Sequence, residues 1–340
     1  RFPDNAAEID AYFEALRSGE EAIRLVSAER SMPEPVRSAH RWWNKKKIDR
    51  WCGRTTSEVI GECISDPKLA AVLSAQWGTY GGIPKQASFA IHALIIRHYL
   101  EGASYPVDGA GSIAAGLVPV IESEGSSARP ETMVDEILIN DGRAIGVRTI
   151  SGQVFEAPAI VSAIGAGETV DRLLPLDIRE QEWAVEIAAM KPSICHFEMF
   201  LGFEGDIEKL GATRSNHWFF ESWETNDGLW TNTEDPIQMM FVSFPSLKDA
   251  NHDPGPSHRH TGQFMVMADW STVADFVTDD GIEDPDKWAA FKADVQTRML
   301  AFFAKKFPAL APLVVCSVFG TPLATAKFTA HEKGGFYGLE

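Results

Sequence analysis

The spacing of apolar residues changes once along this chain, near Thr132, and that change constrains the fold more than any other feature. Before it, apolar residues recur at helical intervals, and the first such stripe comprises Ile9, Tyr12, Phe13 and Leu16. After it, short runs rich in β-branched, aromatic and Met residues follow one another between polar turns. We therefore expect an α+β fold in which a helical region precedes an antiparallel sheet.

Several local signals mark the expected helices. Thr55 and Glu58 have the spacing of a capping box, and Asp66-Pro67 begins a further helix with proline at the tolerated first position. The segment 85–100, "KQASFAIHALIIRHYL", is mostly apolar, so we expect a buried helix there. Residues 180–190 and 285–307 also have helical spacing, and the second of these helices is long enough to cover a sheet.

The strands begin with a hairpin. "MVDEILI" and "AIGVRTI" are joined across Asp141-Gly142, which strongly favours a two-residue turn. A second turn at Ser151-Gly152 leads to the apolar run from Ala159 to Ile164, where we expect a buried strand.

Five further runs, "ICHFEMFLGF", "HWFFESW", "IQMMFVSF", "GQFMVMADW" and "LVVCSVFG", predict one antiparallel sheet. Their large apolar side chains are Phe197, Met199, Phe219, Phe220, Met239, Met240, Phe241, Phe264, Met265 and Met267. Strand alternation sends some of these to each face, so one set can pack under a helix while another lines a cavity for an apolar ligand. A sheet covered on both faces would have the same composition, and both interpretations stay open.

The segment "DGAGSIAAG" at 108–116 contains G-x-G-x-x-A, with Glu131 where an acidic ribose ligand would lie. A dinucleotide-binding turn must follow directly on a buried strand, and the preceding "EGASYPVD" is a poor strand. We interpret the segment as a helix start with Asp108 or Gly109 near the N-cap. Pro119 is expected to weaken the middle of that helix.

Composition excludes some partners. The net charge of −17 argues against nucleic acid, and the basic run at 45–47 has the character of a solvated helix face. The four cysteines form no C-x-x-C pair, which fits a reducing, cytoplasmic compartment. No apolar stretch of the sequence approaches a bilayer span, and we expect no secretory signal. Because the chain starts at Arg1 and ends in "FYGLE", we expect it to be a piece of a longer protein.

Residues 81–125, from "GGIPKQASFAIHALIIRHYLEGASYP" onward, resemble the middle of FAD-dependent polyene oxidoreductases: retinol saturases, carotenoid isomerases and the wider phytoene-desaturase-like group. The hairpin "VDEILINDGRAIGV", the run "AIVSAIG", the segment 241–270 and the C-terminal "GTPLATAKFTAHEKGGFYGLE" continue the resemblance in the same order. Two departures stand out. Val107-Asp108-Gly109 replaces the usual basic residue and paired glycines, and Gly125-Ser126 replaces a Gly-Gly.

The resemblance implies a fold and an activity. Residues 1–100 would form a helical lid region and 101–168 part of an incomplete, glutathione-reductase-like FAD domain. Residues 169–322 would form the substrate domain, and 323–340 a return segment towards the flavin. The family's N-terminal G-x-G-x-x-G and its closing glycine motif are not found in the sequence. We therefore expect FAD in the full-length parent, and no bound FAD and no activity in this chain alone. The substrate would be an apolar isoprenoid polyene that is saturated, desaturated or isomerised.

The resemblance also implies cofactor-binding residues. Val134 would contact the adenine end of FAD through its backbone, although a hairpin core residue is an equal interpretation. Ser162, Ala163 and Gly165 would let the cofactor approach closely, or equally permit tight helix packing. Gly334 and Gly335 resemble the turn that faces the flavin in this family, and they complete the set of implied cofactor-binding residues.

No side chain is assigned as catalytic, since the flavin would carry the hydride. His92 and His98 lie on an apolar helix and are expected to be structural. The group His252, Asp253, His258 and His260 lies in a Pro- and Gly-containing loop without ligand spacing, so no metal site is predicted. A peripheral membrane contact to collect substrate is compatible with these features. The alternative function is a non-catalytic carrier of an apolar ligand.

Overall fold

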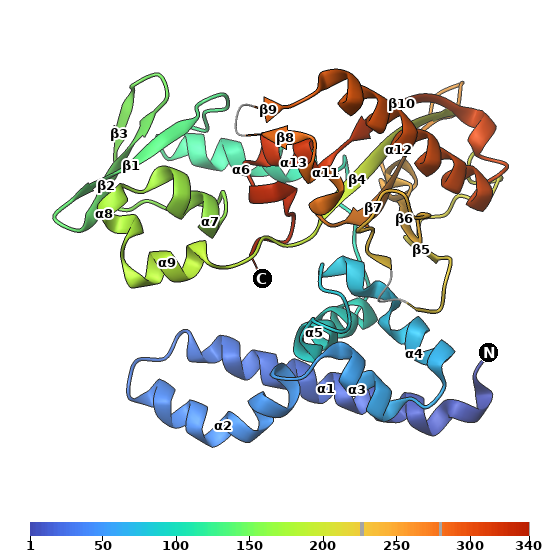
Figure 1. Cartoon of the computed structure of the whole chain (residues 1–340), viewed down its shortest axis with the longest axis horizontal. Helices are drawn as coiled ribbons and strands as arrows, with labels where there is room; N and C mark the ends of the chain where they lie inside the picture. Colours follow the sequence, from blue (N-terminus) through green and yellow to red (C-terminus); the bar gives the residue numbers. More distant parts are fainter. Residues whose placement is uncertain (225–227, 279–280, 340) are drawn as a thin grey trace. The chain divides into compact units, whose positions relative to one another are not determined.

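The structure is a computed structural model that describes residues 1–224, 228–278 and 281–339 (Figure 1). Its contacts divide the chain into two compact units. The first comprises Arg1–Ser104 and His217–Phe241, and the second comprises Tyr105–Asn216 and Val242–Glu340. Each unit is described by itself below.

The first unit is mainly helical, as the sequence predicts. Its helices are α1 (Ala6–Glu29), α2 (Val36–Cys52), α3 (Thr56–Cys63), α4 (Pro67–Ser74) and α5 (Phe89–Leu100), with short 3-10 turns η1 (Pro3–Asn5) and η2 (Ala75–Thr79). The unit also contains strand β5 (His217–Phe220) and the first residues of β6 (Met239–Ser243).

The predicted helix starts are confirmed. The Thr55 hydroxyl accepts a hydrogen bond from the Glu58 N–H at 3.2 Å, and the Glu58 carboxylate accepts one from the Thr55 N–H at 2.8 Å. The Asp66 carboxylate caps α4 by accepting from two backbone N–H groups, and Pro67 is the first helical residue. These bonds satisfy backbone donors that a helix leaves free at its N-terminus.

The core of the helical unit forms where α1, α3 and α5 pack together. Tyr12, Leu16 and Phe89 are buried there, whereas Phe13 of the predicted stripe is largely exposed. Helix α5 is buried along one side only, because Ile91 and Leu100 remain exposed. The prediction of a buried helix is therefore correct for its inner face alone.

In the second unit, the predicted hairpin is confirmed as β1 (Val134–Asn140) and β2 (Arg143–Thr149), followed by β3 (Val154–Glu156) in a three-stranded antiparallel meander. Asp141 and Gly142 have φ of 48° and 73°, the left-handed conformation that a type I′ turn requires at both central positions. The turn sets the register, with Asn140 opposite Arg143.

The expected buried strand from Ala159 to Ile164 is wrong. The segment has no strand partner, and Val161 is 92% exposed. An apolar run becomes a buried strand only when neighbouring strands flank it, and the meander ends at Glu156. Short helical turns follow, namely α7 (Ala166–Glu168), η3 (Thr169–Leu173), α8 (Leu176–Arg179) and α9 (Glu182–Ala188), the last in the segment predicted as helical.

Helix α6 (Gly111–Ser123) confirms that "DGAGSIAAG" starts a helix, although the N-cap is Ala110 and makes no side-chain capping bond. Asp108 and Gly109 instead form a turn with φ of 65° and 76°. Pro119 lies inside α6, and Ile113 and Leu117 are exposed, since the helix has no buried residue.

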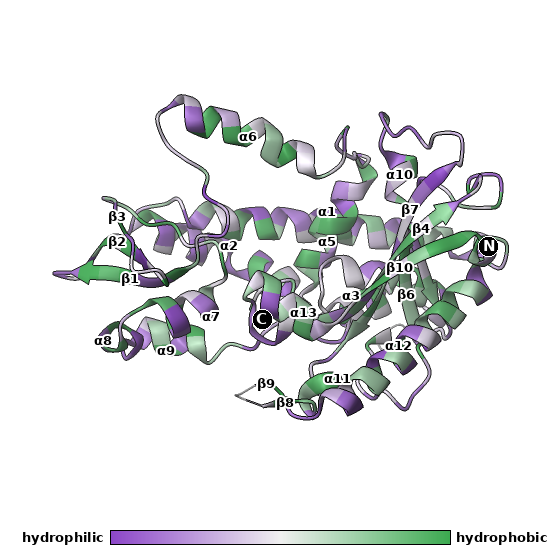
Figure 2. Ribbon diagram, turned by 90° about the horizontal axis from the view of Figure 1, so that it is seen from above, coloured by the Kyte–Doolittle hydropathy of each residue, from purple (hydrophilic) through white to green (hydrophobic). Residues whose placement is uncertain are grey.

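The predicted antiparallel sheet is confirmed. It contains β4 (Cys195–Glu204), β5, β6, β7 (Arg259–Ala268) and β10 (Val314–Gly320) in the order β10-β4-β7-β6-β5. Helix α12 (Pro285–Lys306) covers one face of β4 and β7, where Phe303 stacks on Phe264 with ring centroids 5.2 Å apart (Figures 1 and 2). The remaining elements are α10 (Pro245–Lys248), α11 (Ser271–Ala274), β8 (Val277–Thr278), β9 (Gly281–Ile282), η5 (Ala311–Leu313), α13 (Pro322–Thr329) and η6 (Glu332–Gly334).

Candidate functional site

A small pocket in the second unit joins two segments that are far apart in the sequence. One is the turn that begins at Gly165 and enters α7, and the other is the C-terminal segment after α13. The pocket encloses about 30 Å³, which is room for about two water molecules. Its lining residues are mostly small or flexible: Gly165, Ala166, Gly167, Glu168, Pro192, His331, Glu332, Gly335, Gly338 and Leu339.

Packing within the chain requires glycine at Gly334, which adjoins the pocket, and leaves little room for a side chain at Gly335, which lines it. A Cβ on Gly334, whose φ is 63°, would lie 2.4 Å from the Pro322 carbonyl oxygen. A Cβ on Gly335 would lie 3.0 Å from the Ser193 carbonyl oxygen. The turn therefore fits closely onto α13 and the start of β4, and the glycine pair has a structural reason independent of any ligand.

His331 connects the two sides of the pocket. Its Nδ1 lies 2.8 Å from the Gly335 carbonyl oxygen, which can only accept, so Nδ1 carries a proton and donates it. The other ring nitrogen, Nε2, lies 3.9 Å from the position of a Cβ on Gly165. In the neutral ring, Nε2 is therefore an acceptor directed at the turn where α7 begins. Sequence reasoning missed His331, because only the folded chain brings the two segments together.

The predicted cofactor residues are only partly brought together. Gly165 and Gly335 line one pocket, and Gly334 is buried next to it. Ser162 and Ala163 are exposed, and the Ser162 hydroxyl pairs with Thr169 at 2.6 Å. Val134 begins β1 and packs half-buried against the cluster that contains Ile137 and Leu173. These last three predicted residues are not among those that line the pocket.

The sheet presents a second face to the side opposite α12. Strand alternation places His196, Glu198 and Phe200 of β4 on this face, opposite Met267, Met265 and Gln263 of β7. Met267 is buried, Met265 is half-buried and Phe200 is 45% exposed. By contrast, Phe197, Met199 and Phe264 are buried on the α12 side. Large apolar side chains of β4 and β7 thus lie on both faces of the sheet, as strand alternation predicts.

His196 is the unusual polar residue on this second face. Its Nε2 lies 3.6 Å from the Glu198 carboxylate, and its ring contacts Phe336 of the C-terminal segment with centroids 4.7 Å apart. Its Nδ1 is buried and has no hydrogen-bond partner among the residues that the structure describes. A buried ring nitrogen without a partner is costly unless something else binds it. The His-x-Glu spacing in "CHFEMF" places both side chains on one strand face, which sequence reasoning did not exploit.

Two histidines of the loop at 252–260 make contacts within the loop itself. His252 Nε2 lies 2.9 Å from the Arg259 carbonyl oxygen, so this nitrogen donates a proton there, and in the neutral ring only Nδ1 keeps a lone pair. Burial and the neighbouring His252 lower the pKa of His260. Within 1–224, 228–278 and 281–339, no group of three or more potential ligands is arranged to hold a metal ion. The absence of a metal site stays a prediction.

Searches among known proteins give consistent relatives, although no family model matches the sequence. The chain is 26% identical over 361 residues to the all-trans-retinol 13,14-reductase of Danio rerio, covering all of this chain and 58% of that protein. It is 26% identical over 318 residues to the chloroplastic prolycopene isomerase of Arabidopsis thaliana, covering 90% of this chain and 50% of that protein. The chain therefore spans little more than half the length of the curated relatives it matches.

A solved oxidoreductase from Methanosarcina mazei has the same fold over 86% of this chain and 62% of its own, with a TM-score of 0.56 and 15% identity. The fold is thus one found in an oxidoreductase, a mixture of helices and antiparallel sheet. The resemblance inferred from the motifs is confirmed: over 90% or more of its length the chain is similar to a retinol reductase and to a prolycopene isomerase. In the described part of the chain, no helix is both long and apolar enough to cross a membrane.

Proposed function

We propose that the full-length parent of this chain is an FAD-dependent oxidoreductase that acts on an apolar isoprenoid polyene, and that the chain supplies its substrate-binding portion. Support comes from two relatives whose names specify a retinol and a prolycopene, aligned over 90% or more of the chain. The observation that carries the proposal is the second face of the sheet, where Met and aromatic side chains surround the His196–Glu198 pair. Such side chains make broad contact with an extended apolar chain without requiring hydrogen bonds.

We propose that the turn at Gly165 and Gly335 lies against a section of FAD in the full-length parent. Five of the ten residues that line the pocket there are glycine or alanine, which would allow close approach of a flat ring, whereas Glu168 and Glu332 would repel a phosphate. The pocket's volume of about 30 Å³ is far below the roughly 300–1,000 Å³ of ligand sites, so it would hold only one edge of the cofactor and FAD would extend well beyond it. Val134, Ser162 and Ala163 remain proposed contacts outside this pocket, and the four-part division of the chain at 100, 168 and 322 remains a proposal as well.

Bound FAD would supply the hydride chemistry. The protein's own residues must handle the proton, because saturation of a carbon–carbon double bond adds one hydride and one proton. We assign that proton to His196, whose Nε2 faces a carboxylate while its buried Nδ1 has no described partner. The neighbouring Glu198 would stabilise the charged ring. The surrounding Met and Phe side chains would exclude water from the substrate.

The test uses the full-length parent. We expect it to purify with bound flavin, whereas this chain alone is expected to be colourless. Under anaerobic conditions, retinoids or carotenoids should change the flavin absorbance spectrum or yield product, and amines and polar alcohols should not. Reaction with the polar compounds only would remove the polyene assignment. Tight binding of a polyene without flavin or turnover would favour the carrier instead.

His196 is tested by His196→Gln in the same full-length protein. General acid–base catalysis contributes about 10²–10⁴-fold, so turnover should fall by about that factor while polyene affinity is retained. The matched control is His98→Gln, since His98 is exposed on α5. Loss of binding together with turnover, or an unchanged pH profile of turnover, would assign His196 a structural role.

A further inference from the structure

Helix α2 combines exposed tryptophans with a concentration of positive charge. Trp42 and Trp43 are 76% and 80% exposed, and their rings meet edge to face with centroids 6.3 Å apart. Between Val36 and Cys52 the helix carries six basic side chains and one acidic side chain, in a chain whose net charge is −17. No residue of α2 is fully buried. Neither feature is explained by the core or by the pocket described above.

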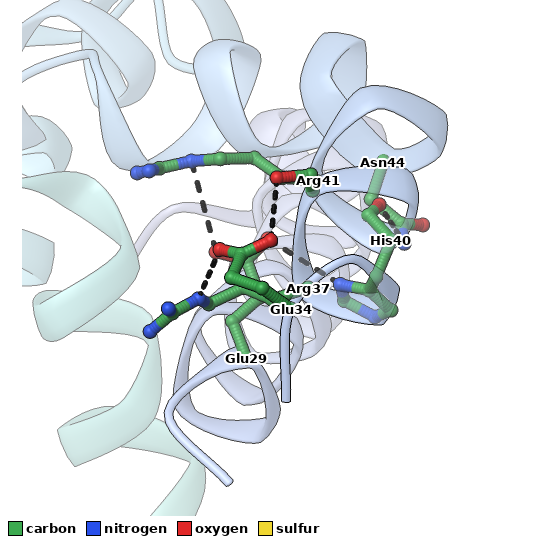
Figure 3. A network of polar contacts seen from close by, with 7 residues as sticks. Glu29, Glu34, Arg37, His40, Arg41 and Asn44 are labelled. Carbon is green, nitrogen blue, oxygen red and sulfur yellow. Dashed lines mark hydrogen bonds and ion pairs between the residues drawn. The ribbon is translucent and has the colours of Figure 1, made fainter. Parts of the chain in front are cut away.

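The inner side of α2 holds the helix in place. Helix α2 packs on α1 and α5, and its half-buried residues include His40, Asn44, Ile48 and Trp51. At the tip of the α1–α2 hairpin, the buried Glu29 carboxylate lies 3.3 Å from His40 Nδ1 and 3.7 Å from Arg41 Nε, as Figure 3 shows. These contacts orient the opposite side of the helix towards solvent.

The outer face is defined by Trp42, Trp43, Lys45, Lys46 and Arg50. Lys46 follows Trp42 by four residues and Trp43 by three, so it lies beside both rings on the helix surface. No ion pair of Lys46 occurs among the described residues, whereas Lys45 pairs with Asp49. The face therefore offers two amphipathic rings with adjacent uncompensated positive charge.

We propose that this outer face of α2 docks the protein onto the surface of an anionic phospholipid membrane. Tryptophan rings are favoured at the level of lipid headgroups, where one edge is wet and the other apolar. Lys and Arg beside them are attracted to anionic headgroups, and an interfacial helix lies flat with its polar side anchored. The local excess of six basic over one acidic side chain on α2, in a chain of net charge −17, favours an anionic surface as the occupant.

Membrane docking is consistent with an apolar substrate, because such a substrate would be dissolved in membranes. The docking proposal itself is argued from α2 alone and does not depend on the proposed function. Surface association through a single helix face needs no spanning segment. Residues 45–47 lie on helix α2 with Lys45 and Lys46 exposed, as the prediction of a solvated helix face requires. The exposed tryptophan pair is the reason to go beyond that interpretation.

The experiment is sedimentation of the chain with vesicles of phosphatidylcholine and phosphatidylserine in equal parts, compared with phosphatidylcholine alone. We expect binding to the anionic vesicles only, weakened by added salt. Each Lys or Arg near such a surface contributes about a fivefold change in affinity, so Lys46→Gln with Arg50→Gln should weaken binding about 25-fold. Trp42→Ala with Trp43→Ala should weaken it about tenfold or more, from the lost apolar burial.

Matched controls are Lys327→Gln on α13 and Trp183→Ala on α9, another exposed tryptophan, which should bind as the wild type does. Circular dichroism should show unchanged helix content, because the substituted α2 side chains are exposed. Equal binding to both kinds of vesicle, or unaltered binding of the α2 variants, would overturn the proposal. So would tryptophan-dependent binding to a DNA oligonucleotide, or a wild-type dimer that the tryptophan variants dissociate.

Discussion

A buried histidine makes the stability of the helical unit depend on pH. His92 of α5 is fully buried, and its Nε2 and Nδ1 lie 2.9 Å and 3.1 Å from the hydroxyls of Tyr12 and Tyr80. Burial lowers the pKa of His92 from 6.5 to about 4. Between these two values the unfolded chain binds a proton that the folded chain does not. Stability is therefore fully present above about pH 6.5 and decreases as the pH falls towards 4.

The size of the effect follows from the two pKa values. Lowering the pH from about 7.5 to about 5.5 should reduce the free energy of unfolding by about 1.3 kcal/mol through His92 alone. Carboxylates contribute little in this window, because their pKa values lie near or below about 4.5. Below about pH 5 the carboxylates with lowered pKa, such as Glu20 and Glu62, add a loss of the same sign.

The assay is urea denaturation followed by circular dichroism at both pH values; because both units contain helices, comparison with His92→Gln isolates the contribution of the helical unit. His92→Gln keeps a hydrogen-bonding side chain but cannot ionise, so its unfolding free energy should change by at most a few tenths of a kcal/mol between them. His98→Gln changes an exposed histidine of the same helix and should retain the wild-type pH dependence. The reasoning is refuted if His92→Gln loses as much stability as the wild type on acidification.

Three further substitutions test the packing. Gly334→Ala should lower the unfolding free energy of the second unit by about 2–4 kcal/mol in urea, because the new Cβ would clash with the Pro322 carbonyl. The control Gly338→Ala places its Cβ in open space and should cost only about 1 kcal/mol, for the strained backbone. Equal costs for the two variants would contradict this reasoning. Thr55→Ala removes the capping box and should cost about 1 kcal/mol in the thermal unfolding of the helical unit, and an unchanged midpoint would argue against the cap. Phe303→Ala should cost about 3–5 kcal/mol in urea unfolding by leaving a cavity under α12, and a cost below about 1 kcal/mol would show that the site collapses.

Local interactions in this protein could be predicted because they depend on residues close together in the sequence. The capping box at Thr55, the proline start at Pro67 and the type I′ turn at Asp141-Gly142 each involve a few neighbouring residues. Strand alternation likewise assigned the side chains of β4 and β7 to two faces. The family resemblance was also visible in the sequence, since its motifs occur in a fixed order along the chain.

Burial was less predictable, because it depends on what packs against a segment. The apolar run at 159–164 predicted a core strand, yet Val161 is exposed where no strand adjoins it. Helix α6 is similarly apolar and has no buried residue. The number of apolar residues in a segment measures its capacity for burial, whereas neighbouring elements determine whether burial occurs.

The sequence by itself determined where most helices, turns and strands form and which family the chain resembles, the strand expected at 159–164 being the exception. Only the tertiary structure decided that His331 meets the turn at Gly165, that His196 faces Phe336, and that two tyrosine hydroxyls enclose His92. The physical reason is that periodicity and capping arise from the geometry of adjacent peptide units, which the residue types control directly. Contacts between distant segments depend instead on how whole helices and strands pack, and local sequence patterns do not predict which segments come into contact.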